Sequence, residues 1–163
     1  MEAVAAKPSP TKKATTRKVK KVAVLGSGVM GSRIACHFAN VGLDVVLLDI
    51  VPRELNKKEE AKGFSLESPI VRNRIVNDAL KFAIKSNPSP LYSKGAVSHI
   101  KTGNFDDNMA MLSDCDWIIE AVVERLDIKQ IVFTNVEKYR KQGSLITSNT
   151  SGIPIHMLTE GRS

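Results

Sequence analysis

Residues 26–31 (GSGVMG) form a glycine turn of the type that can hold the pyrophosphate of a dinucleotide. An apolar run rich in β-branched residues, 22–25, precedes the turn, and a segment with helical spacing follows it. Gly26 would permit a tight turn, Gly28 would let the backbone approach phosphate oxygens, and Gly31 would let the helix pack close to the strand. The free N–H groups at the start of this helix would then face the phosphate charge.

Asp49 indicates which dinucleotide the turn would serve. A second apolar run, 44–48, ends at Asp49, which lies 18 residues beyond Gly31. A carboxylate at that strand end accepts hydrogen bonds from the ribose hydroxyls and repels a 2′-phosphate, so the pattern favours NAD over NADP. Two alternatives remain open: Asp49 is only a solvated strand-end residue, or the nearby Arg53 serves a 2′-phosphate.

The periodicity of the remaining chain predicts further strands that alternate with helices. Strand–helix alternation with short loops predicts an α/β fold, a Rossmann-type doubly wound parallel sheet in a single truncated domain, with a helical insertion between strands two and three. The expected helices are 53–62, 69–84 (starting at Pro69), 106–112, 126–139 and 153–159, and the further strands are 100–104, 116–123 and 144–148.

The net charge of +7 is concentrated at the amino terminus. Residues 1–21 hold seven Lys and Arg residues and a single acidic residue, so the rest of the chain is nearly neutral. We therefore expect a disordered basic arm over residues 1–18 and one NAD-binding domain over residues 19–163. A near-neutral body argues against nucleic acid as a partner, and no apolar run is long enough to cross a membrane.

The two cysteines, Cys36 and Cys115, lie in apolar segments and are expected to be buried small residues. They provide neither a disulfide framework nor a metal site, which suits a reducing cytoplasm. We expect a cytoplasmic protein with no metal.

Two further polar clusters follow predicted strands. Glu120 and Glu124 flank the end of the fourth strand, with Lys129 in the helix after it, and the run 148–151 (SNTS) closes the fifth strand. Carboxyl ends of strands form the rim on which an open α/β sheet binds its ligands.

From about residue 20 onward, the chain resembles the NAD-binding half of the 3-hydroxyacyl-CoA dehydrogenase family. The resemblance rests on the glycine turn with Met30 before Gly31, on Asp49, on the Glu-x-x-x-Glu strand end and on the SNTS run. It implies NAD-dependent oxidation of a 3-hydroxyacyl-CoA to a 3-ketoacyl-CoA in fatty-acid β-oxidation. The partners that it implies are an acyl-CoA substrate and, for the full-length protein, a homodimer or a multifunctional β-oxidation protein.

The resemblance also implies roles for single residues. A serine at position 151 would hydrogen-bond the reacting oxygen, and Asn149 would lie beside the nicotinamide ribose. The residues assigned to cofactor binding are Gly26, Ser27, Gly28, Val29, Met30, Gly31, Asp49, Glu124, Lys129 and Asn149, and the residue assigned to the reaction is Ser151.

Each of these positions has a plainer alternative. Glu124 and Asp127 could owe their place to the dipole of the helix that they begin. Lys129 could be a solvated surface residue, and Ser151 could be only the N-cap of the helix that follows. Glu120 is expected to support the strand end rather than touch ligand.

The catalytic histidine of the family belongs to a His-Phe-Phe-Asn-Pro run about twenty residues beyond the SNTS run, a position that this sequence does not reach. The three histidines, His37, His99 and His156, are not placed to replace it. We therefore expect no turnover from this chain alone, and we expect the helical dimerisation domain to lie outside it.

Two other functions remain open. The group of 3-hydroxyisobutyrate and 6-phosphogluconate dehydrogenases shares a Gly-x-Gly-x-Met-Gly turn, and a non-catalytic NAD-sensing module would also lack a catalytic histidine. A downstream His-Phe-Phe-Asn-Pro run would distinguish an enzyme from such a module.

Overall fold

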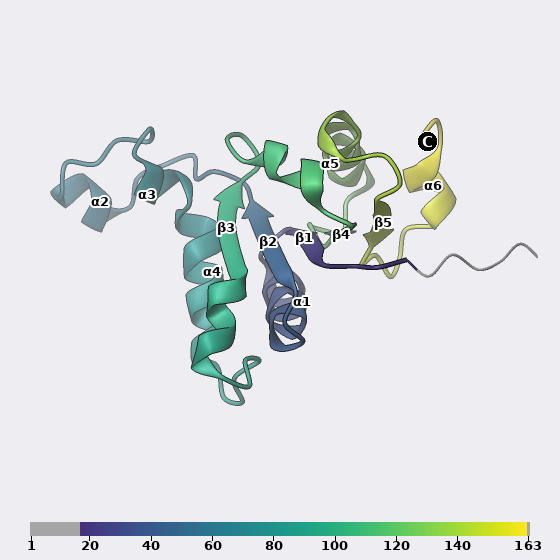
Figure 1. Cartoon of the computed structure of the whole chain (residues 1–163). Coiled ribbons are helices and arrows are strands. Elements are labelled where there is room, and N and C mark those ends of the chain that lie inside the picture. The colour runs from purple at the N-terminus through teal and green to yellow at the C-terminus, as the bar shows by residue number, and fades with distance from the viewer. Residues whose placement is uncertain (1–16, 163) are drawn as a thin grey trace, which may run out of the picture.

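The computed structural model describes residues 17–162, in which five parallel strands form one sheet (Figure 1). The strand order is β3-β2-β1-β4-β5, so the chain crosses the sheet between β3 and β4. This order confirms the expected doubly wound parallel sheet. The strands are β1 (Lys21–Leu25), β2 (Asp44–Asp49), β3 (Ile100–Asn104), β4 (Trp117–Glu120) and β5 (Leu145–Ser148).

The central strands are apolar because both faces of the sheet are covered. Ala23 on β1 lies between Val46 on β2 and Ile118 on β4, and these residues pack towards α5. Val22 and Val24 point to the opposite face, towards α1 and α4. Successive side chains alternate between the two faces, so one continuous apolar run serves two cores.

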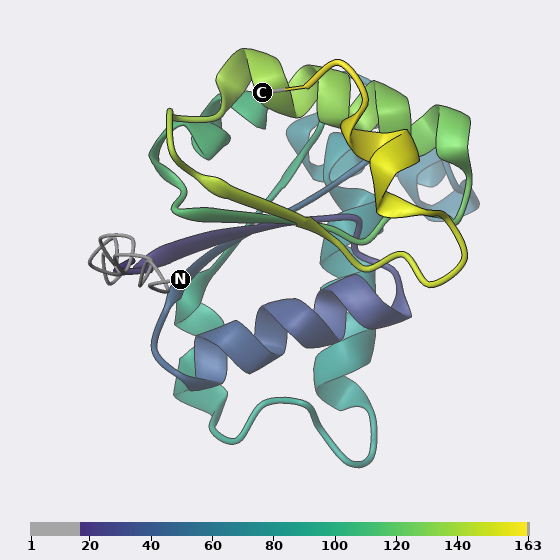
Figure 2. The same ribbon diagram turned by 90° about the vertical axis from the view of Figure 1, so that its right-hand side faces the viewer.

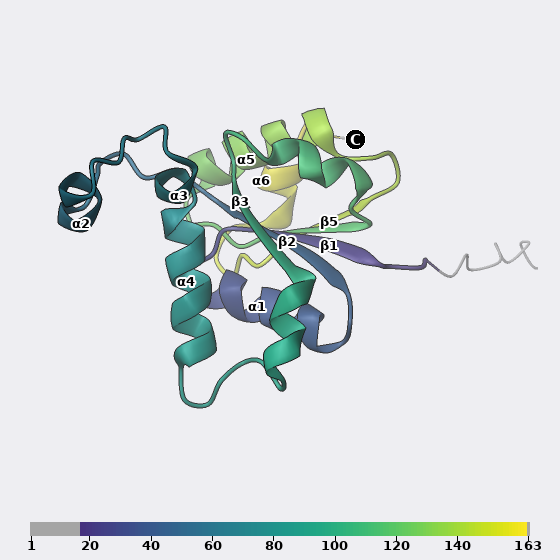
Figure 3. The same ribbon diagram turned by 60° about the vertical axis from the view of Figure 1, so that its left-hand side comes forward.

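Helices cover the two faces of the sheet. Figure 2 shows α1 on one side and α5 on the other, and Figure 3 shows α4 beside α1. The helices α2 and α3 stand away from the sheet and, with α4 and η1, form the expected insertion between β2 and β3 (Figure 1). The helical elements are α1 (Val29–Asn40), α2 (Lys57–Ala61), α3 (Pro69–Arg72), α4 (Arg74–Lys85), η1 (Lys94–His99), η2 (Met109–Asp114), α5 (Leu126–Tyr139) and α6 (Ile155–Thr159).

Several predicted helices differ from the structure at their ends. The prediction of helix from residue 53 is wrong, because Asn56 caps α2: its side chain accepts from the backbone of Glu59, whose carboxylate accepts from Asn56 N. The helix expected over 106–112 is a 3₁₀ helix, η2, and the helix expected from 153 begins at Ile155.

The single helix expected from Pro69 to residue 84 is two helices, α3 and α4, separated at Asn73. The Asn73 amide donates to Pro69 O at 3.2 Å, and its oxygen accepts from Asn104 Nδ2 at 2.9 Å. A side chain that bonds to nearby backbone competes with helix hydrogen bonds. The side chain at the break thus also contacts Asn104, a residue distant in sequence.

The start of the folded region is anchored at residues 20 and 21. The backbone N–H groups of Lys20 and Lys21 donate to the Asp116 carboxylate at 2.7 and 3.0 Å. Most of the arm predicted over residues 1–18 lies outside the described residues. Across residues 17–162, no helix combines the length and the hydropathy that a bilayer crossing requires.

Candidate functional site

A groove of about 820 Å³ lies at the carboxyl ends of the strands, where the strand order reverses between β1 and β4. Open α/β sheets bind ligands at this point. The groove brings together residues from the glycine turn, from the end of β2 and from the loops after β4 and β5. The predicted site residues that line it are Gly26, Gly28, Val29, Met30, Asp49, Glu124, Asn149 and Ser151.

Each of the three motif glycines is needed for a different physical reason. Gly26 has φ of +100°, and a Cβ there would lie 2.6 Å from Ala121 O. A Cβ on Gly31 would lie 1.8 Å from Gly26 O, so this position requires close packing of helix on turn. A Cβ on Gly28 would meet nothing within 4 Å, although this residue lines the groove. Gly28 thus leaves space open for a ligand.

The first turn of α1 presents free donors to the groove. Gly28 is the N-cap of this twelve-residue helix, and no side chain within residues 17–162 caps its backbone N–H groups. The first turn also holds no acidic residue. Uncapped N–H groups and the helix dipole together attract anionic groups such as a pyrophosphate.

Asp49 is held by neutral donors at the opposite wall. Its Oδ2 accepts from Ser27 N at 2.6 Å and from Ser27 Oγ at 2.5 Å, and its Oδ1 accepts from Ile50 N at 2.7 Å. No cation among residues 17–162 pairs with it. Asp49 is therefore a fixed carboxylate rather than a freely solvated one. The buried Ser27 orients it through two hydrogen bonds. Arg53 is exposed and does not line the groove.

Lys129 and Glu120 form a buried ion pair beneath the other end of the groove. Lys129 Nζ lies 2.8 and 3.0 Å from the two carboxylate oxygens of Glu120, and the side chains are 1% and 0% exposed. Glu120 also accepts from Val122 N at 2.7 Å and from Ser148 Oγ. The alternative that Lys129 is a solvated surface residue is therefore wrong, and the expected support of the strand end by Glu120 is confirmed.

Glu124 joins the loops that follow β4 and β5. Its Oε2 lies 3.1 Å from Lys129 Nζ. Its Oε1 accepts from Thr150 Oγ1 at 2.5 Å, from Gly152 N at 2.9 Å and from Ser151 N at 3.1 Å. These donors, with Thr150 first, lower the pKa of Glu124 to about 2, so the carboxylate is charged at neutral pH. A helix dipole alone does not explain this position.

Ser151 and Asn149 lie on the same loop and line the groove. Asn149 N donates to Glu120 O at 2.7 Å, which continues the pairing of β5 with β4. The alternative that Ser151 is the N-cap of the next helix is wrong, since α6 begins at Ile155 and Pro154 is its N-cap. The exposed Ser151 side chain accordingly does not cap α6.

The histidines and cysteines lie away from this groove. None of His37, His99 and His156 lines it. Cys36 and Cys115 are buried and free, as expected, and burial raises the pKa of the Cys115 thiol to about 11. Neither thiol is in the ionised form that acts as a nucleophile.

Sequence reasoning missed part of the groove. Phe105, Asp106 and Met109, which follow β3, line it together with Asp49. They are adjacent because β3 pairs with β2, so that Phe105 N donates to Asp49 O at 2.9 Å. The predicted third strand ends just before these residues, and its carboxyl end could have indicated that they lie at the ligand-binding edge of the sheet.

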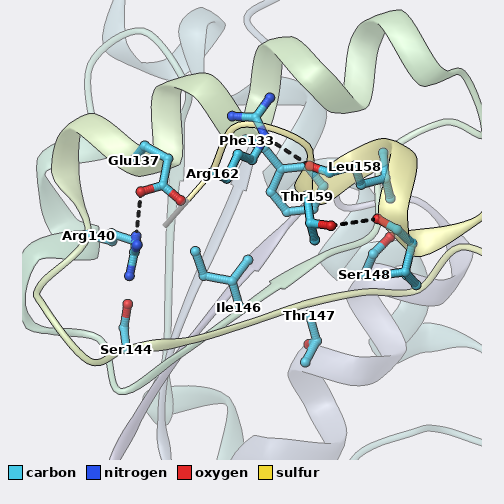
Figure 4. A pocket seen from close by; sticks show the side chains of 11 residues that line it. Phe133, Glu137, Arg140, Ser144, Ile146, Thr147, Ser148, Leu158, Thr159 and Arg162 are labelled. Atoms are coloured by element: carbon cyan, nitrogen blue, oxygen red, sulfur yellow. Dashed lines mark hydrogen bonds and ion pairs between the residues drawn. The ribbon is translucent and has the colours of Figure 1, made fainter.

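A second groove, of about 600 Å³, lies between α5, β5 and α6. Figure 4 shows Phe133 and Ile146 lining it, with the ion pair of Glu137 and Arg140 at its rim. Ser144 Oγ is buried there without a hydrogen-bond partner in the described part of the chain. Of the predicted site residues, none lines this groove.

The first groove fits NAD on chemical grounds. Gly28 leaves space beside uncapped N–H groups, which suits a pyrophosphate, and Asp49 presents a carboxylate, which suits ribose hydroxyls. The apolar side chains of Phe105 and Met109 line the same end of the groove, where an adenine ring would need them.

Comparison with known proteins agrees with this chemistry. The family described as 3-hydroxyacyl-CoA dehydrogenase, NAD binding domain, matches residues 21–163. A probable 3-hydroxyacyl-CoA dehydrogenase of Bacillus subtilis is 50% identical over 89% of this chain, and a putative fatty acid oxidation complex trifunctional enzyme of Rickettsia felis is 37% identical over 87%. The matched region spans only 18% of the length of each relative.

Among solved structures, (S)-3-hydroxybutyryl-CoA dehydrogenase PaaH1 from Ralstonia eutropha is similar, with a TM-score of 0.60 and 27% identity. The similarity covers 90% of this chain and 46% of that protein. These matches decide against the 3-hydroxyisobutyrate and 6-phosphogluconate dehydrogenase group as the family of this sequence. The chain belongs to the 3-hydroxyacyl-CoA dehydrogenase family, of which it carries the NAD-binding domain.

Proposed function

We propose that this chain is the cofactor half of an enzyme that oxidises a 3-hydroxyacyl-CoA to a 3-ketoacyl-CoA in fatty-acid β-oxidation. One observation carries the proposal: a single groove combines the open space at Gly28, the fixed carboxylate of Asp49 and the loop with Ser151. The names of the Bacillus and Rickettsia relatives support the same reaction.

Different residues of the groove would bind different parts of the cofactor. The backbone of residues 26–31 would hold the pyrophosphate, and Asp49 would hold the adenosine ribose. Glu124 and Asn149 would then lie at the nicotinamide end, with Lys129 as the support of Glu124 from beneath. When bound, NAD supplies the acceptor for a hydride.

Ser151 would contact the substrate. The residue lines the groove, and its backbone N–H group donates to Glu124. A donor in this place can hydrogen-bond the oxygen at C3 as that carbon loses hydride. The proton of the hydroxyl needs an acceptor, and no histidine of this chain lines the groove. We assign that step to a histidine outside this chain.

The relatives support a larger assembly. Each of the two relatives is more than five times as long as the matched region, and the Rickettsia protein is named a trifunctional enzyme. We propose that this domain works beside further domains, as part of a homodimer or of a multifunctional β-oxidation protein. Two buried, unpaired cysteines suit a reducing compartment, and we propose the cytoplasm.

Cofactor binding is tested by calorimetric titration of this chain with NADH and, separately, with NADPH. We expect saturable binding of NADH and binding of NADPH that is at least tenfold weaker. Asp49→Ala should weaken NADH binding, whereas Asp78→Ala, which removes an exposed carboxylate on α4, should not. Equal affinities for the two cofactors would contradict the role of Asp49.

Turnover is tested with 3-hydroxybutyryl-CoA and NAD, followed by the absorbance of NADH. We expect none from this chain alone. Measurable oxidation would contradict the assignment of the proton acceptor to a residue outside the chain.

A further inference from the structure

Glu120 is a fully buried carboxylate at the end of β4. Its Oε1 accepts from Lys129 Nζ at 2.8 Å and from Val122 N at 2.7 Å. Its Oε2 accepts from Lys129 Nζ at 3.0 Å and from Ser148 Oγ. Both oxygens thus accept from donors on the loop after β4, on α5 and on β5, and Glu120 does not line the groove.

Stability alone does not explain a charged pair in this place. Removing two ions from water is costly, and apolar residues of similar size are often at least as stabilising. The neighbouring positions on β4, Ile118 and Ile119, are apolar and buried. What an ion pair offers and an apolar contact lacks is direction, because each hydrogen bond fixes the place of a particular atom.

The atom that Glu120 fixes is Lys129 Nζ. Besides Glu120, this nitrogen contacts Glu124 Oε2 at 3.1 Å and Val122 O at 3.5 Å. The ammonium group therefore lies between a carboxylate in the core and a carboxylate at the groove. A flexible lysine side chain would otherwise turn towards water, since its charge is strongly hydrated.

Glu124 in turn holds the loop after β5 by hydrogen bonds. It accepts from Thr150 Oγ1 and from the backbone N–H groups of Ser151 and Gly152. One chain of contacts thus runs from Glu120 through Lys129 and Glu124 to the loop of Ser151. A second contact, between Glu120 and Ser148 Oγ, holds the start of the same loop.

We propose that Glu120 is a positioning residue for the nicotinamide end of the cofactor site, an inference that rests on the proposed function. It holds Lys129 in place beneath Glu124, and so it fixes Glu124 and the loop of Asn149 and Ser151 in the geometry that binds cofactor. Asp49, at the other end of the groove, is independent of this chain of contacts.

The first test is Glu120→Gln. Glutamine keeps the size but presents an amide N–H₂ group to the Lys129 ammonium in place of one acceptor oxygen. We expect NADH to bind about tenfold more weakly, with the preference for NADH over NADPH unchanged. In an NMR spectrum, the backbone amide signals of Ser151 and Gly152 should shift or broaden. Ile118→Val, a buried control on the same strand, should leave both readouts as in the wild type.

The second test applies if Glu120→Gln fails to fold. Glu120→Met/Lys129→Met replaces both ions by apolar side chains of similar length, which should preserve folding. We expect a folded protein that still binds NADH about tenfold more weakly than the wild type.

Wild-type NADH affinity in the double variant would show that the pair only supports the fold, and it would overturn the inference. Wild-type affinity and unchanged loop amides in Glu120→Gln would also overturn it. Failure of the wild-type chain to bind NADH would instead refute the proposed cofactor site, a result that the same titration identifies.

Discussion

The two ends of the groove hold their carboxylates in different ways. Asp49 is fixed by three neutral donors, from Ser27 and Ile50, and its pairing needs no cation. Glu124 also accepts from three neutral donors, but in addition it pairs with Lys129, whose charge is in turn matched by Glu120 in the core. The end proposed for adenosine is thus held by neutral donors, whereas the end proposed for nicotinamide includes an ion network that reaches the interior.

This difference separates binding from folding. At the Asp49 end, the donors are neutral, so the loss of one leaves no buried charge unpaired, and we expect it to change the cofactor site and leave the core intact. At the Glu124 end, the loss of one ion leaves another buried without its partner, and a buried unpaired charge is costly. A substitution at the Asp49 end should therefore lower cofactor affinity with little loss of stability, whereas the removal of one ion at the Glu124 end should lower stability most.

The largest expected effect is that of Lys129→Met on stability. It leaves the Glu120 carboxylate, which is 0% exposed, without its cation, and breaking a buried pair in this way costs about 3–5 kcal/mol. Urea unfolding followed by circular dichroism measures the loss. Lys138→Met, on the exposed face of the same helix, should change the free energy of unfolding by less than about 0.5 kcal/mol. A loss below about 1 kcal/mol for Lys129→Met would show that the two ends are built alike.

Gly28→Ala, in the glycine turn, should lower NADH affinity and leave stability almost unchanged. Its Cβ would meet no atom of the described part of the chain within 4 Å, so the fold should tolerate it, but the methyl group would occupy the space proposed for the pyrophosphate. We expect NADH binding about 10- to 100-fold weaker, which corresponds to an overpacking cost of about 1–3 kcal/mol. Gly95→Ala, on exposed η1 away from the groove, should leave the affinity unchanged. An unfolded Gly28→Ala protein would contradict the separation of binding from folding.

The glycine turn and Asp49, at the proposed adenosine end, could be singled out from the sequence because their signals are local, whereas Phe105, Asp106 and Met109 beside Asp49 could not. The glycine turn and Asp49 belong to two adjoining strand ends, and their spacing alone indicates a dinucleotide site. The apolar runs of β1, β2 and β4 likewise predict buried parallel strands, and the spacing of α5 gave its bounds correctly. Periodicity reports which face of an element is covered, and this is sufficient for the architecture.

The nicotinamide end was not predictable in the same detail. Sequence alone gave Lys129 two interpretations, a cofactor contact and a solvated residue, and did not give burial against Glu120. That contact requires the first turn of α5 to lie over the end of β4. The hydrogen bond from Asn104 to Asn73, at the break between α3 and α4, is a second contact of this kind. Local patterns do not encode such pairings, which arise from the tertiary fold.

Ser27→Ala tests how much the neutral donors contribute to cofactor binding. It removes the bond from Ser27 Oγ to Asp49 and keeps the bond from Ser27 N. The loss of one of three donors should cost about 0.5–1.5 kcal/mol, that is, about two- to tenfold in NADH affinity. Calorimetric titration should also find a smaller preference for NADH over NADPH, because the Asp49 carboxylate is held by two donors instead of three. Glu124→Gln, at the far end, should leave that preference unchanged, and a change of equal size in both variants would contradict independent ends.

The smallest expected effect is on acid stability. The donors from Thr150, Gly152 and Lys129 lower the pKa of Glu124 to about 2, below its value of 4.5 as a free side chain. Because the pKa is lower in the folded state, the charged carboxylate stabilises the fold above pH 4.5, and this contribution is lost as the pH falls from 4.5 towards 2. Glu124→Gln should therefore lose less stability than the wild type across that interval, as measured by urea unfolding at each pH.

Asp116 provides the control for that interval. The Lys141 ammonium and the backbone N–H groups of Lys20 and Lys21 lower its pKa to about 2 as well, but it lies at the opposite end of the strands. Asp116→Asn should thus flatten the same part of the pH profile without any effect on NADH binding, whereas Glu124→Gln should change both. If the two variants change the pH profile alone, Glu124 serves only to join two loops, and the nicotinamide end of the site must be built from other residues.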